Sequence, residues 1–103
     1  MEKKLEDNLL AEEVKIIAEK DLELAEKLSE SIQDSEAKVM AFLNLYTVSK
    51  NQKYVEKALE NAKSDSDYLR IIEVSGLDVA ERIKDRYKKD LAYASLFEKT
   101  CNF

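Results

Sequence analysis

The scarcity of turn-forming residues constrains this chain more than any other feature. Its 103 residues include one glycine, Gly76, and no proline. Tight turns between β-strands depend on glycine, proline or asparagine–glycine pairs, so an all-β fold lacks the residues that its turns require. Alanine, leucine, glutamate and lysine, which are strong helix formers, recur throughout the sequence instead. The sequence therefore predicts an all-α fold.

Helix boundaries are indicated by residues that cap helix N-termini. Short side chains with an acceptor oxygen precede the apolar-periodic runs; these are Asp21, Asp34, Asn51, Ser64 or Asp65, Asp78 and Asp90. Gly76 suits the position just beyond a helix C-terminus, where the backbone is often left-handed. The expected helices are about seven and short, covering residues 2–19, 21–32, 35–49, 52–62, 65–75, 78–88 and 90–100.

One of these segments differs from the rest in its pattern of apolar residues. Residues 35–49 are apolar on nearly every side, which predicts a helix buried at the centre of the fold. We expect the helices at 65–75 and 90–100 to pack beside it. Phe97 aligns with Phe42 when the two halves of the sequence are compared, so both are expected in the core.

Internal similarity supports a repeated unit. Residues 14–28 match residues 69–83, with Ile16 aligned on Ile71. A triplet of similar residues also occurs three times, as Ala25-Glu26-Lys27, Val55-Glu56-Lys57 and Ala80-Glu81-Arg82. This pattern resembles α-solenoid repeats of the tetratricopeptide or HEAT-like kind. The resemblance implies antiparallel helix–turn–helix units, stacked as a small right-handed solenoid or a compact bundle in a single domain over residues 1–103. It also implies a tendency to bind other proteins.

The residues that are missing exclude several kinds of chemistry. Histidine is absent, which excludes serine–histidine–aspartate catalysis and histidine metal sites. A single cysteine, Cys101, cannot build a zinc or iron–sulfur site within one chain, and one glycine cannot form a phosphate-binding loop. Glu26 and Glu30 share a helix face, but a solvated surface explains them better than a metal site. We expect no enzyme activity, no cofactor and no metal.

Charge and cysteine content bear on partners and location. The net charge is −5, so nucleic acid is not expected as the main partner. Residues 1–36 hold twelve acids and five lysines, whereas the later part of the chain is slightly basic. No apolar run is long enough to span a membrane. One cysteine favours a reducing cytoplasm, and the high lysine and glutamate content is typical of thermophile proteins.

Aromatic and basic side chains supply the candidate binding residues. Tyrosine is favoured at protein interfaces because it buries a ring while its hydroxyl stays in water. The candidate interface consists of Tyr54, Arg82, Arg86, Tyr87, Tyr93 and Phe103. These residues predict a non-catalytic, protein-interaction or scaffold module that binds another protein or a peptide. The alternatives are a structural subunit that forms homo-oligomers through apolar end helices, and a ligand-binding helical bundle.

Overall fold

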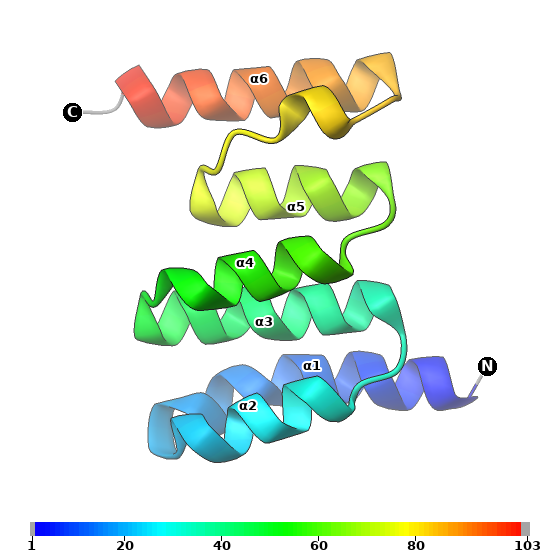
Figure 1. Cartoon of the computed structure of the whole chain (residues 1–103), viewed down its shortest axis with the longest axis vertical. Helices are drawn as coiled ribbons and strands as arrows, with labels where there is room; N and C mark the ends of the chain where they lie inside the picture. The colour runs from blue at the N-terminus through cyan, green and yellow to red at the C-terminus, as the bar shows by residue number, and fades with distance from the viewer. Residues whose placement is uncertain (1, 102–103) are drawn as a thin grey trace. The chain divides into compact units, whose positions relative to one another are not determined.

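The computed structural model describes the backbone of residues 2–101 and the side chains of residues 6–98. Within this range every regular element is helical, which confirms the all-α fold (Figure 1). The elements are α1 (Glu2–Lys20), α2 (Leu22–Ser31), α3 (Ser35–Ser49), α4 (Gln52–Asn61), α5 (Asp65–Ser75), the 3₁₀ turn η1 (Ala80–Arg82) and α6 (Arg86–Cys101). They form two compact units, residues 1–62 and residues 63–103. The single domain over 1–103 stays a prediction.

Helix α3 is the centre of the first unit. It packs against α1, α2 and α4, as its nearly continuous apolar sequence predicts. Its buried side chains are Ala37, Val39, Ala41, Phe42, Leu43 and Leu45. Helices of ten residues such as α2 and α4 are marginal in isolation, so this shared core is what stabilises them.

The N-terminal caps lie largely where the sequence places them. Asp21, Asp34 and Asn51 each accept a hydrogen bond from a backbone N–H in the first turn of the helix that follows. Ser64 caps α5 in a reciprocal arrangement with Asp67, whose carboxylate accepts from the Ser64 N–H. Gly76 ends α5 at a φ of 76°, in the left-handed region where a residue without a Cβ is favoured.

The second unit contains α5, η1 and α6, and here the predicted boundaries are wrong. Residues 78–85 do not form an α-helix and hold only the three-residue turn η1, while residues 86–88 belong to α6. Helix α6 begins at Arg86 rather than at residue 90, because Asp85 is the capping residue: its carboxylate accepts from the Lys88 N–H at 2.9 Å. Asp90 therefore lies inside α6, and there are six α-helices in the described chain instead of seven.

In each unit an aspartate carboxylate accepts hydrogen bonds from the backbone just before a later helix of that unit. Asp7 of α1 accepts hydrogen bonds through Oδ2 from the N–H groups of Gln33 (3.2 Å) and Asp34 (2.9 Å), just before α3. Asp65 of α5 accepts from the N–H of Lys84 through Oδ1 (3.0 Å) and from that of Asp85 through Oδ2 (2.8 Å), just before α6. Each carboxylate thus satisfies two backbone donors that no intrahelical acceptor serves.

These two junctions show which parts of the units correspond. Asp7 corresponds to Asp65, and Asp34 corresponds to Asp85. The first pair lies farther apart in the sequence than the second, because η1 is shorter than α2. No constant offset can therefore align the units. The alignment of Ile16 with Ile71 is wrong, because Ile16 is 62% exposed whereas Ile71 is fully buried.

Candidate protein-binding face

The structure brings four of the six candidate interface residues into one unit. Arg82 lies in η1, and Arg86, Tyr87 and Tyr93 lie in α6, all with exposed side chains. Tyr54 is wrongly placed in the candidate interface: it lies in α4 and is 1% exposed, so its ring is not offered to a partner. Phe103 lies outside the described residues.

Helix α6 exposes a row of apolar side chains. Tyr87 is 69% exposed and Phe97 67%, and Leu91 and Tyr93 are also large exposed apolar residues. Residues three or four apart are neighbours on a helix surface, so these side chains and Ala94 connect into one strip. We call this strip the α6 face, made up of Tyr87, Leu91, Tyr93, Ala94 and Phe97.

The opposite side of α6 explains which way this face points. Ala92 is fully buried, and α6 packs against α5 and η1 of its own unit. A small side chain there lets the helix approach its neighbours closely, while the larger side chains remain on the solvent side. The prediction that Phe97 is a core residue is therefore wrong, although Phe42 is indeed buried.

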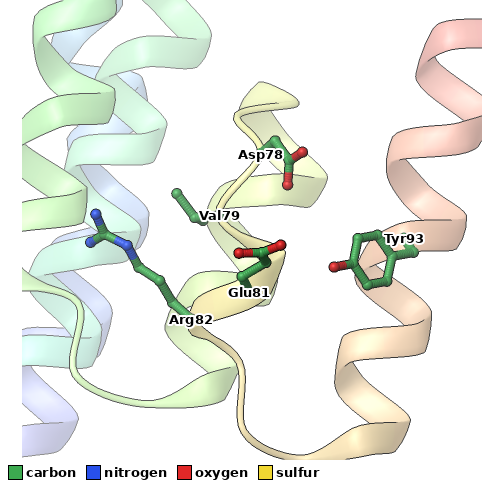
Figure 2. Close-up of a pocket in the computed structure, with 5 residues that line it drawn as sticks. All are labelled: Asp78, Val79, Glu81, Arg82 and Tyr93. Atoms are coloured by element: carbon green, nitrogen blue, oxygen red, sulfur yellow. The ribbon is translucent and has the colours of Figure 1, made fainter.

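A shallow hollow of about 430 Å³ adjoins the α6 face in the same unit. It is lined by Asp78, Val79, Glu81, Arg82 and Tyr93. Figure 2 shows the Tyr93 ring reaching from α6 toward Glu81, whereas the Arg82 guanidinium points away from Tyr93. That guanidinium lies over the Tyr68 ring, 6.0 Å from its centroid. Tyr93 therefore belongs to both the hollow and the α6 face, with two carboxylates beside it.

Basic side chains gather where α6 begins. Arg82, Lys84 and Arg86 are exposed, and the ammonium of Lys88 donates to the Ser66 hydroxyl at 3.1 Å. The Asp65 carboxylate lies at the same junction. Its pKa is held below the ordinary value, first by the N–H of Lys84, then by that of Asp85 and by the nearby lysine charges.

The acidic pair Glu26 and Glu30 faces lysines of α4. Lys53 lies 3.5 Å from Glu26, and Lys57 lies 3.1 Å from Glu30. The hydrogen bond to Glu30 raises the pKa of Lys57. A ladder of surface ion pairs between α2 and α4 accounts for these carboxylates.

Metal sites and membrane-spanning helices are not found in the described part of the chain. Among residues 6–98 no three histidine, cysteine, aspartate or glutamate side chains are grouped so that they could hold a metal ion. No described helix combines the length and apolar character needed to cross a membrane. No protein-family model, curated protein or solved structure matches the chain.

Sequence reasoning missed Leu91 and Phe97 as surface residues. The spacing that could have revealed them is present, because Tyr87–Leu91 and Tyr93–Phe97 are each four residues apart. It was obscured by placing the helix start at residue 90, which puts Tyr87 in a different helix from the other two aromatic residues.

Proposed function

We propose that this chain is a non-catalytic protein-interaction module of the helical-repeat type, and that its α6 face binds an amphipathic helix of a protein partner. One observation carries the proposal: Tyr87, Leu91 and Phe97 expose large apolar surfaces along one helix, in which Ala92 is fully buried. Exposed apolar strips with a polar rim are typical of protein-binding surfaces.

The chemistry of the strip suits such a partner. Two tyrosines and a phenylalanine can each bury a large ring area, and tyrosine keeps its hydroxyl at the rim. Apolar side chains of a partner helix, spaced three and four residues apart, match the spacing of the α6 face. Asp78 and Glu81 in the adjoining hollow favour a lysine or arginine at the edge of that helix.

The non-catalytic part of the proposal is supported by the residue types available. The sequence has no histidine, and Glu26 and Glu30 are occupied by ion pairs. We further propose that the module acts in the cytoplasm, since Cys101 is its single cysteine.

The test is a quantitative affinity capture from the source organism with three baits: the natural chain, Leu91→Glu and Val74→Glu. Leu91→Glu puts a charge in the middle of the α6 face. Val74→Glu is the matched control, because Val74 is an exposed apolar residue of α5. The proposal expects at least one protein retained by the natural and control chains and lost with Leu91→Glu. If no captured protein depends on Leu91, the α6 face is not a binding surface.

A further inference from the structure

We infer that the hollow beside Tyr93 binds a lysine of the partner helix, and that this helix packs on α6 in the way that α4 packs on α3. The inference rests on the proposed function of the α6 face and specifies the chemistry of the partner. It is carried by the correspondence between the two units. Helix α6 corresponds to α3, but no helix among the described residues of the second unit corresponds to α4.

Helices α3 and α6 match position by position when both are counted from their caps, Asp34 and Asp85. Residues at equal distances from the caps have the same burial on the inner side of each unit. The matched pairs, all buried, are Ile32 with Ile83 and Ala41 with Ala92. The two helices therefore turn the same side toward their own units.

The neighbours of the two helices differ by one element. Helix α3 packs against α1, α2 and α4, whereas α6 packs against α5 and η1, which correspond to α1 and α2. Three buried residues of α3 match three exposed residues of α6, and the pairs are Val39 with Asp90, Phe42 with Tyr93 and Leu43 with Ala94. The α6 face thus includes positions that are covered in α3, where α4 is the additional neighbour.

A lysine of α4 fills this place in the first unit. The Nζ atom of Lys57 lies 3.1 Å from Glu30 Oε1 and 5.8 Å from the centroid of the Phe42 ring. An ammonium group at that distance is attracted to the face of an aromatic ring, and the carboxylate adds an ion pair. Val55 and Ala58 of α4 are fully buried, so the apolar side of α4 holds Lys57 between the carboxylate and the ring.

The second unit has the same carboxylate and ring without the lysine. Glu81 and Tyr93 occupy the positions of Glu30 and Phe42, counted from the helix caps. Both line the hollow of about 430 Å³, and Figure 2 shows the Tyr93 ring reaching toward Glu81. No ion pair joins Glu81 to another described residue. The hollow is therefore the counterpart of the space that Lys57 fills.

The charges around the hollow agree with a basic occupant. Asp78 also lines the hollow, and Asp90 and Glu98 are exposed on α6. Arg86, in the first turn, is the one exposed base among the described side chains of α6, and the Arg82 guanidinium lies over an aromatic ring of α5. We therefore expect a basic partner helix with apolar residues two positions before and one position after its lysine, as in α4.

A tethered copy of α4 tests the inference. The chain is extended after Phe103 by a flexible glycine–serine linker and a copy of residues 51–62. The linker raises the effective concentration of this helix to about the millimolar range, which compensates for the weak binding of a short helix. Nuclear magnetic resonance gives the ratio of bound to free copy from the Tyr93 ring signals. We expect nuclear Overhauser contacts between that ring and the copy's counterpart of Lys57.

Two substitutions isolate the lysine. Glu81→Gln is expected to lower the bound-to-free ratio about two- to fivefold. Lys57→Gln, made only in the appended copy, is expected to lower it about three- to tenfold, because the contact with the ring is lost as well. The two changes together should cost no more than Lys57→Gln alone, since they remove one shared interaction. Glu73→Gln is the matched control, an equal change of charge at an exposed residue of α5 outside the hollow, and should leave the ratio unchanged.

Two outcomes overturn the inference, and they separate it from the proposed function. If the copy packs on α6 but neither substitution lowers the ratio, or Glu73→Gln lowers it equally, the hollow does not bind a lysine, although the α6 face does receive a helix. If the copy makes no contact with Tyr93, α6 does not receive a helix as α3 does. The capture experiment with Leu91→Glu then decides the proposed function by itself.

Discussion

Replacement of Asp7 by alanine tests whether the junction before α3 depends on one carboxylate. The side chain is buried and accepts two backbone hydrogen bonds, from Gln33 and Asp34. Hydrogen bonds to a charged group contribute about 1.5–3 kcal/mol each, and Gln33 is exposed enough for water to replace part of its bond. We therefore expect the free energy of unfolding to fall by about 2–4 kcal/mol.

Urea unfolding followed by far-ultraviolet circular dichroism measures this change. Asp7→Asn keeps one carbonyl oxygen as an acceptor without the charge, so its loss is expected to be about half as large. Glu6→Ala is the control, since Glu6 is the exposed neighbour on the same helix. A loss below about 0.5 kcal/mol for Asp7→Ala, equal to that of the control, would refute the reasoning.

Three further predictions concern other parts of the structure. The pKa of Asp65 is lowered from its ordinary value of 3.8, so its contribution to the free energy of unfolding is present above that pH and is lost as the pH falls through the lower folded-state pKa. Asp65→Asn lacks this titration and should therefore lose less stability than the natural chain between pH 6 and acid. Urea unfolding midpoints measure both losses, and equal losses would contradict the prediction. Lys50 ends α3 at a φ of 59°, so Lys50→Gly should raise the free energy of unfolding by up to about 1 kcal/mol, and a decrease would show that the left-handed backbone costs little there. Phe42 is 1% exposed in α3, so Phe42→Ala should lower the melting temperature by an amount equivalent to about 3–5 kcal/mol, unlike Phe97→Ala on the surface, and similar losses would contradict the placement of these rings.

Local features of the fold could be predicted because they depend on neighbours in sequence. A capping side chain acts on an N–H two or three residues away, so Asp34 and Asn51 mark helix starts without tertiary information. The central position of α3 follows equally from its own apolar residues.

The misplaced residues depend on contacts between distant segments. Asp85 rather than Asp90 caps α6, and the preceding backbone is fixed by Asp65, which lies two elements earlier in the chain. Nothing within a short window distinguishes those two aspartates as caps. The burial of Tyr54 likewise depends on the elements packed around α4, and a tyrosine of the same type remains exposed at Tyr87.

Only part of the α6 face could be predicted from the sequence. Tyr87 and Tyr93 were correctly placed on the surface from their residue type and their position late in the chain. Leu91 and Phe97 join them only once residues 86–101 are known to form one helix. Correct helix bounds would thus have supplied the whole strip.

The central claim is that the α6 face contacts a protein, and site-specific crosslinking tests it most directly. A photoreactive amino acid is placed at the position of Leu91 in one version of the chain and at that of Val74 in another, and each is irradiated in the cells of origin. The account predicts a discrete crosslinked protein, whether another protein or a second copy, from the Leu91 position and none from the Val74 position. No crosslink at Leu91, or the same products from both positions, would contradict it.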